Sequence, residues 1–413
     1  MTLSRGVSIL IKRDSASRFR RCWADAHTML SSAAATHSAA ERMLVLWFEM
    51  TAGNSVLLLT GASGLVGSGL FSLLSNKSRL CILLSRAPEK LQSFGRHGSC
   101  SVFKGDITRP YLGLDDHTYA ELKRSITEII HCAADTRFGI PLDCARRSNT
   151  EGTQAVLDLA SECRGLKKFA YISTVYAVGR SVGYFPENSI QHNNGFCNAY
   201  QQSKYEAEQL VSEAMARLPA AVFRLSSIIG DSVSGTVLQF NHVHRLLRLF
   251  AQNVLPVAPG RLDAPIDLIA SDWALPALAY LFESAFNPSQ FYHICAGPES
   301  SLTVREMIDL TISVFEGHAS GQKWLPLRVP QLVSLSHYES FVKQRARDGD
   351  KVFNELVRVL GYFLPHLALF QAFDNTNTVR TLRPSGLKLP PIRDCYERVV
   401  RFCLDTNWGR SRQ

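Results

Sequence analysis

The chain has 413 residues, of which 46% are hydrophobic and 20% are charged, a composition typical of globular proteins and too apolar for a disordered scaffold. Lys and Arg outnumber Asp and Glu by 45 to 36, and the net charge of +9 favours anionic ligands such as phosphates. Long basic runs with interleaved aromatic residues are absent, so we expect no nucleic-acid partner. No apolar run reaches the roughly 18 residues of a membrane-spanning helix, so we expect a soluble, cytoplasmic protein with at most peripheral membrane contact.

The first 50 residues form an extension ahead of the first predicted strand. Residues 1–22 hold five Arg, one Lys and four Ser with a single acidic residue, Asp14, a balance similar to that of organellar targeting peptides. Alternatively, translation starts at Met43 or Met50 and the extension is disordered. We treat 1–50 as a disordered or targeting segment.

From Ser55 onward, short apolar runs alternate with segments of helical period, which predicts repeated βα units and a parallel sheet. The predicted strands are the runs at 56–60, 80–85, 100–105, 128–133, 168–173 and 221–226. Crossover helices are predicted at 65–76, 142–163 and 200–217. The fold class is therefore α/β, with a doubly wound parallel Rossmann sheet in 51–236. A smaller, mostly helical substrate lobe follows in 237–413, with a returning strand near 291–296.

Three glycines, Gly61, Gly64 and Gly67, lie between the first predicted strand and the first predicted helix, the context in which such a pattern binds a dinucleotide. The first permits a tight turn, the second lets the backbone approach a pyrophosphate, and the third lets the helix pack closely on the strand. The helix N-terminus presents unpaired N–H groups to the anion. Three neighbours are also expected to contact the cofactor: Ser63, Leu65 and Val66.

The second predicted strand ends at Ser85 and Arg86, where NAD-binding sheets ordinarily carry an acidic residue for the ribose hydroxyls. A basic residue suits a 2′-phosphate, so NADPH (NADP+) is predicted over NAD(H). After the fourth predicted strand, the small residues Ala133 and Ala134 let the backbone close over the cofactor ribose.

Tyr200 and Lys204 are one helical turn apart, so their side chains share a helix face. Reduction of a carbonyl needs a proton donor at the oxygen, and a Tyr becomes a better acid and base when a neighbouring ammonium stabilises its phenolate. Thr174 lies at the end of the fifth predicted strand, where ligands bind in such sheets, and its hydroxyl can stabilise negative charge on the substrate oxygen. Ser173 is the alternative, since a shift of one residue exchanges the two.

The order of these motifs resembles the extended type of the short-chain dehydrogenase/reductase superfamily over residues 55–235. The resemblance implies that Asp106 and Ile107 reach the adenine, although Asp106 also suits a plain turn. It implies that Asn149 orders a proton-relay water or the geometry of the fourth strand, with helix initiation as the alternative. We also place Ser226, at the end of the sixth predicted strand, beside the cofactor.

Four segments are similar to the fatty acyl-CoA reductase and thioester reductase branch of this superfamily: GDITRPYLGLDD, IIHCAADTRF, NTEGT and FRLSSIIGDSVSG. This branch includes the reductase domains of carboxylic acid reductases. The similarity implies NADPH-dependent reduction of an acyl thioester, held by coenzyme A or a carrier, to an aldehyde, to an alcohol or to both in turn. Thr174 and Tyr200 stabilise the oxyanion in this scheme, and a homodimer is implied as well. Leu225, in place of a common Pro, and the additional Tyr176 depart from the family pattern.

Two alternative functions share parts of this pattern. A nucleotide-sugar epimerase or dehydratase, or a 3β-hydroxysteroid or flavonoid-type reductase, has the same catalytic trio, although epimerases usually carry an acidic residue at Ser85 and Arg86. A non-catalytic NADPH-binding regulatory protein does not need Tyr200 and Lys204. His242 and His244 lack further ligands nearby, so no metal is predicted. The apolar stretches 242–259 and 359–373 are predicted to pack in the core, with an acyl tunnel or a membrane-facing surface as alternatives.

Overall fold

The computed structural model describes residues 55–410 apart from 76–78, 93, 95–99, 193, 319–326 and 348–360. The extension 1–50, with its basic segment and its alternative start sites, lies outside the described residues. Ser55–Gln413 make up one compact unit. Within the described part of the chain, every helix is too short or too polar to span a bilayer.

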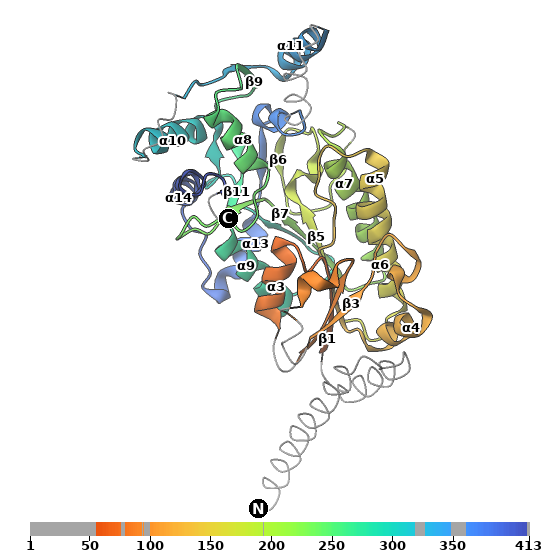
Figure 1. Ribbon diagram of the computed structural model, residues 1–413. Coiled ribbons are helices and arrows are strands. Elements are labelled where there is room, and N and C mark those ends of the chain that lie inside the picture. Colours follow the sequence, from red (N-terminus) through yellow and green to blue (C-terminus); the bar gives the residue numbers. More distant parts are fainter. Residues whose placement is uncertain are drawn as a thin grey trace, which may run out of the picture. The chain divides into compact units, whose positions relative to one another are not determined.

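A parallel sheet of seven strands forms the centre of this unit (Figure 1). Its strands in chain order are β1 (Ser55–Thr60), β2 (Arg79–Ser85), β3 (Cys100–Lys104), β4 (Glu128–His131), β5 (Lys168–Thr174), β7 (Ala220–Leu225) and β12 (Phe291–Ile294). In space the order is β12-β7-β5-β4-β1-β2-β3, so the chain winds outward in both directions from β1. The predicted doubly wound parallel sheet is confirmed, and each predicted strand is one of its members.

Helices cover both faces of the sheet. The helices are α3 (Leu65–Leu74), α4 (Asp116–Ser125), α5 (Leu142–Arg146), α6 (Gly152–Glu162), α7 (Ala199–Ala214), α8 (His242–Ala251), α9 (Ser271–Glu283), α10 (Val304–Glu316), α11 (Leu335–Arg347), α13 (Thr376–Leu382) and α14 (Ile392–Asp405). On one face α3 packs against α9, and on the other α5, α6 and α7 pack together (Figure 1). The strands are apolar because both of their faces are buried: every residue of β2, β4 and β7 is buried.

The predicted helix 142–163 contains an irregularity that its apolar spacing did not indicate. One turn of π-helix, Arg147–Glu151, lies between α5 and α6. Such a turn widens the helix by one residue and is frequent at functional sites. Here it carries Asn149, one of the predicted site residues.

Residues after 236 belong partly to the sheet and partly to the region beyond its carboxyl edge. β12 pairs with β7 in parallel, and one continuous hydrophobic core runs from Leu57 to Leu404. Among the described residues, four two-stranded sheets accompany the central sheet: β8 (Ser227–Gly230) with β11 (Leu268–Ala270), β9 (Val257–Pro259) with β14 (Gln331–Val333), β10 (Pro265–Ile266) with β13 (Leu302–Thr303), and β6 (Gly183–Phe185) with β15 (Gln371–Phe373). The domain boundary at 236 stays a prediction.

Candidate active site

A large cleft lies along the carboxyl ends of the strands, at the point where the strand order reverses between β1 and β4. Ligands bind at this point in open α/β sheets. Its volume of about 1020 Å³ is at the upper end of ligand pockets, so it has room for a dinucleotide and a second ligand together. The residues predicted to bind the cofactor all line it: Gly61, Ser63, Gly64, Leu65, Val66, Gly67, Ser85, Arg86, Asp106, Ile107, Ala133, Ala134, Tyr200, Lys204 and Ser226.

The turn after β1 requires glycine at two positions. Gly61 has φ +75°, and a Cβ there would lie 2.6 Å from the backbone nitrogen of Ala133. A Cβ on Gly67 would lie 2.3 Å from the Gly61 carbonyl oxygen. At Gly64 the nearest atom would be 3.5 Å away, so this glycine leaves open space at the N-terminus of α3. The turn therefore has the shape that a pyrophosphate approaching α3 needs, and the binding of a cofactor by these glycines stays a prediction.

The end of β2 carries positive rather than negative side chains. Arg86 is exposed and Lys90 also lines the cleft. The Ser85 hydroxyl accepts from the backbone N–H of Ala87 at 3.1 Å. Asp106, after β3, forms a turn by accepting from the backbone N–H of Thr108 at 3.0 Å and from its hydroxyl at 2.9 Å. Asp106 thus forms a turn and also lines the cleft.

Thr174 and Tyr200 meet in the middle of the cleft. Thr174, at the end of β5, and Tyr200, near the start of α7, both line this part of the cleft. Burial raises the pKa of Tyr200 to about 12, and the Thr174 hydroxyl acts in the opposite direction. This direction is opposite to the lowering expected beside an ammonium: burial is the largest cause, and Lys204 is not among the groups that shift this pKa. Tyr200 is therefore fully protonated near pH 7, the form that donates a proton.

Lys204 lies one turn further along α7 and is buried. Its Nζ donates to the carbonyl oxygen of Ile172 at 2.7 Å and lies 4.1 Å from the centre of the Tyr171 ring. Burial lowers the pKa of Lys204 to about 7, while the negative charge of Glu208 raises it. Small changes in its surroundings therefore change its charge at neutral pH.

Ser173 and Asn149 hold the frame of the site. Ser173 points away from Tyr200, because its hydroxyl donates to Glu208 Oε2 at 2.7 Å. The Asn149 side chain accepts from the backbone N–H of Asp135 at 2.7 Å and donates to the Asp135 carbonyl at 3.0 Å and to Ser203 Oγ at 2.9 Å. Asn149 thus ties the loop after β4 to α7.

Below the cleft, His131 has both ring nitrogens paired. The Thr153 hydroxyl uses its proton to donate to the Asn149 carbonyl at 2.5 Å, so it accepts from the Nε2 of His131 at 3.0 Å. The Nδ1 of His131 therefore carries no proton, and it accepts from the Thr60 hydroxyl at 2.7 Å. Burial, followed by the charge of Lys204, lowers the pKa of His131 to about 3. His131 is therefore a neutral core residue that braces the first and fourth strands.

An aromatic cluster over Tyr200 was not predicted residue by residue. Phe138 stacks on Tyr200 with ring centres 5.3 Å apart, and Phe363 lies 4.5 Å from both Phe138 and His242. His366 pairs with Gln201 at 2.7 Å. These side chains come from the loop after β4, from α8 and from the segment after 360. Both predicted apolar stretches therefore line the cleft, while other members such as Leu247 pack in the core.

The two His residues of the HVH sequence have protein partners. His242 Nε2 pairs with Ser227 Oγ at 3.1 Å, and His244 bonds to the Ile229 carbonyl at 2.8 Å and caps α8 through the Asn241 N–H. No group of three or more His, Cys, Asp or Glu side chains that suits a metal ion occurs among the residues the structure describes.

Comparisons with known proteins add an independent line of evidence. A family model described as "Male sterility protein", an NAD-binding family, matches residues 59–278. The chain is 30% identical over 213 residues to an isonitrile lipopeptide synthase of Streptomyces coeruleorubidus, over 46% of this chain and 14% of that protein. It is 32% identical over 212 residues to the adenylate-forming reductase Nps9 of Serpula lacrymans, over 43% of this chain and 18% of that protein. The chain therefore spans less than a fifth of the length of these two curated relatives.

Among solved structures, the terminal R domain from the myxalamid PKS-NRPS biosynthetic pathway has a similar fold. The TM-score is 0.67 at 23% identity, over 86% of this chain and 92% of that one.

Proposed function

Because the chain belongs to the NAD-binding family described as "Male sterility protein", we propose that it is an NADPH-dependent reductase of an acyl thioester. One observation carries the proposal: Thr174, Tyr200 and Lys204 line the same cleft as the glycine turn, with Lys204 one helical turn after Tyr200. Hydride reduction of a carbonyl requires a proton donor, a second hydroxyl and an ammonium beside a dinucleotide site. The relative named as a reductase supports the same class of reaction.

NADPH is proposed over NADH because of the charges at the end of β2. Arg86 and Lys90 line the cleft there, and guanidinium and ammonium groups both bind phosphate well. Gly61 and Gly67 permit the close backbone contacts of the turn, and Gly64 leaves open space at the N-terminus of α3 for a pyrophosphate. These residues would hold the adenosine phosphates, and NADPH when bound supplies the hydride that the acyl carbon accepts.

The residues of the chain then act on the substrate oxygen. Thr174 donates a hydrogen bond to the developing oxyanion, and Tyr200 delivers its proton to that oxygen. Lys204, when charged, stabilises the Tyr200 phenolate that remains. Loss of the thiol from the resulting hemithioacetal yields an aldehyde, and a second round of reduction yields an alcohol. Asn149 keeps the β4 loop against α7 while this happens.

The acyl group is proposed to lie along the aromatic side of the cleft. Phe138, Phe363 and Phe373 line this side together with Leu367 and Leu369. Apolar walls of this kind favour burial of an apolar chain. The thiol half of the substrate, coenzyme A or a carrier phosphopantetheine, then leaves through the open mouth of the cleft.

Anaerobic turnover of the purified chain tests the proposal. NADPH and NADH are supplied with a panel of acyl-coenzyme A thioesters and free aldehydes, and nicotinamide absorbance and products are followed. We expect NADPH oxidation with thioesters and the appearance of aldehyde or alcohol. If no thioester is consumed, ketones, sugars and steroids are added next. Turnover with these alone would show that the proposed substrate is wrong while the catalytic set remains.

A further inference from the structure

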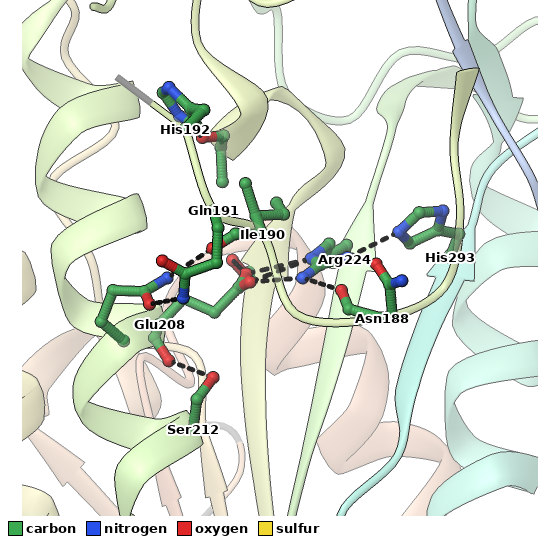
Figure 2. Close-up of polar contacts among 11 residues, drawn as sticks. Asn188, Ile190, Gln191, His192, Glu208, Ser212, Arg224 and His293 are labelled. Carbon is green, nitrogen blue, oxygen red and sulfur yellow. Dashed lines mark hydrogen bonds and ion pairs between the residues drawn. The ribbon is translucent and has the colours of Figure 1, made fainter. Parts of the chain in front are cut away.

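A buried ion pair lies under the catalytic helix, outside the groups used above. Glu208 follows Lys204 by one turn of α7 and is 0% exposed, and its partner Arg224 of β7 is 1% exposed. Arg224 Nη2 lies 2.5 Å from Glu208 Oε1, and its Nε donates to both carboxylate oxygens at 3.1 Å. Figure 2 shows the two side chains pointing toward each other, with His293 on the far side of Arg224. A buried pair of this kind needs further hydrogen bonds to offset its desolvation.

Those bonds come from one row of residues across the sheet. The strand register places Arg224 opposite Ser173 of β5 and opposite His293 of β12. Ser173 Oγ donates to Glu208 at 2.7 Å, and Arg224 Nη1 donates to His293 Nε2 at 2.8 Å. Burial, and then the charge of Arg224, lowers the pKa of His293 to about 3, so this ring stays neutral and accepts. The row Ser173–Arg224–His293 therefore binds the Glu208 carboxylate from the sheet side.

This row lies directly before the catalytic end of β5. Ser173 precedes Thr174, and the carbonyl of Ile172, one residue earlier, accepts from Lys204 at 2.7 Å. Two consecutive residues of β5 are thus tied to α7, one through Lys204 and one through Glu208. The meeting of Thr174 with Tyr200 depends on how α7 lies against this strand.

We propose that Glu208 is a positioning residue: it holds α7 on the row Ser173–Arg224–His293 so that Tyr200 and Lys204 lie at the catalytic end of β5. The proposal rests on the proposed function, since it assumes the roles given to Thr174, Tyr200 and Lys204. It assigns the buried ion pair a part in the reaction beyond holding the fold together.

The effect of Glu208 on the pKa of Lys204 depends on which other titratable groups surround Lys204. The titratable groups around it come from three elements, namely Tyr200 and Glu208 of α7, His131 and Cys132 at the end of β4, and Tyr171 of β5. Burial raises the pKa of Cys132 to about 12 and that of Tyr171 well above its usual range, so both stay neutral. Glu208 is therefore the anion among the described groups around Lys204. Without it, the pKa of Lys204 falls further.

Two variants on α7 separate this role from general effects. Glu208→Gln removes the charge but keeps the shape of the side chain. Glu206→Gln is the matched control, because Glu206 is on the same helix and is also paired with an arginine, Arg146, at 2.8 and 2.6 Å, but it faces away from the cleft. The double variant Glu208→Gln with Arg224→Met removes the whole pair, which leaves no unpaired buried charge and commonly costs little stability.

Lys204 is titrated by NMR in ¹⁵N-lysine-labelled protein, with Lys204→Met for assignment, and kcat is measured against pH. In Glu208→Gln we expect kcat to fall about tenfold to a hundredfold. Activity needs charged Lys204, so kcat falls as pH rises through the pKa of Lys204. In Glu208→Gln we expect this alkaline limb of the kcat–pH profile to move to lower pH by about one unit, together with the midpoint of the NMR titration. The double variant shows a smaller shift in the same direction, because it also removes the positive charge of Arg224, and its Tm stays close to that of the wild type. Glu206→Gln changes neither quantity.

The proposal would be overturned by a folded Glu208→Gln variant, or double variant, that meets two conditions. Its Lys204 titrates at the same midpoint as in the wild type, and its kcat is within about twofold of that of the Glu206→Gln control. The NMR titration needs no turnover. If the wild-type chain reduces no thioester, the proposed function fails, and the position of the Lys204 midpoint in Glu208→Gln still decides the charge effect of Glu208.

Discussion

The two sides of the cleft are built from different kinds of structure. The cofactor side consists of backbone turns that follow β1, β2, β3 and β4 in order, lined by glycine, alanine and serine. The aromatic side consists of side chains from three segments far apart in the chain, represented by Phe138, His242 and Phe363. Tyr200 belongs to both, since it stacks on Phe138 and lines the cleft together with Thr174 and Lys204.

This difference indicates which side tolerates change. A backbone turn with a close contact allows no added atom, because the neighbouring backbone cannot move aside. An aromatic wall can be altered in volume while the sheet stays intact. We therefore expect substitutions on the cofactor side to affect folding or cofactor choice, and substitutions on the aromatic side to affect the substrate alone.

The largest effect is expected where the two sides meet. Tyr200→Phe removes the proton donor and keeps the ring that stacks on Phe138, so turnover should fall by about 10²–10⁴-fold with NADPH binding retained. Tyr205→Phe is the control, because Tyr205 is on the same helix but packs against His192 and Phe196. Steady-state kinetics and NADPH fluorescence titration give the two readouts. Normal turnover in Tyr200→Phe would remove Tyr200 from the mechanism.

Within the glycine turn, two identical substitutions should differ. Gly67→Ala puts a methyl group 2.3 Å from the Gly61 carbonyl and should lower the free energy of unfolding by about 1–3 kcal/mol. Gly64→Ala meets its nearest atom at 3.5 Å, so its unfolding free energy should change by less than about 1 kcal/mol while NADPH binds more weakly. Urea unfolding and fluorescence titration measure both. Equal destabilisation by the two variants would contradict the close-contact argument.

Cofactor choice should change at the end of β2. Arg86→Ala is expected to raise the KM for NADPH about tenfold to a hundredfold, the loss of one charge-assisted hydrogen bond, and to leave the KM for NADH nearly unchanged. Lys104→Ala is the matched control, since Lys104 pairs in register with Ser85 but does not line the cleft. Equal effects on the two cofactors would argue against a 2′-phosphate contact at Arg86.

The smallest effect is expected on the aromatic side. Phe363→Ala removes one wall of the proposed acyl site and should raise the KM for a long-chain thioester about tenfold, the value of one buried aromatic side chain. NADPH affinity and Tm should stay near those of the wild type. Tyr184→Ala, at a 70% exposed aromatic residue outside the cleft, is the control. A loss of NADPH binding in Phe363→Ala would show that the two sides are not independent.

Much of the sheet and of the cofactor side could be predicted from local patterns. Apolar runs such as 56–60 and 221–226 correspond to β1 and β7, and the returning strand near 291–296 is β12. The choice between Ser173 and Thr174 could not be made, because adjacent strand residues point in opposite directions and only the contacts show which one meets Tyr200. The π-helical turn at Asn149 also escaped prediction, since its residues keep an ordinary helical pattern.

By itself, the sequence determined the order of strands and helices, the glycine turn and the helical spacing of Tyr200 and Lys204, because each depends on residues within a few positions of one another. The tertiary structure decided which distant side chains meet. It placed Phe138, His242 and Phe363 over Tyr200 and joined Glu208 to the row Ser173–Arg224–His293. Such contacts depend on strand register and helix packing, which bring together residues as far apart in the chain as Phe138 and Phe363 and have no local signal.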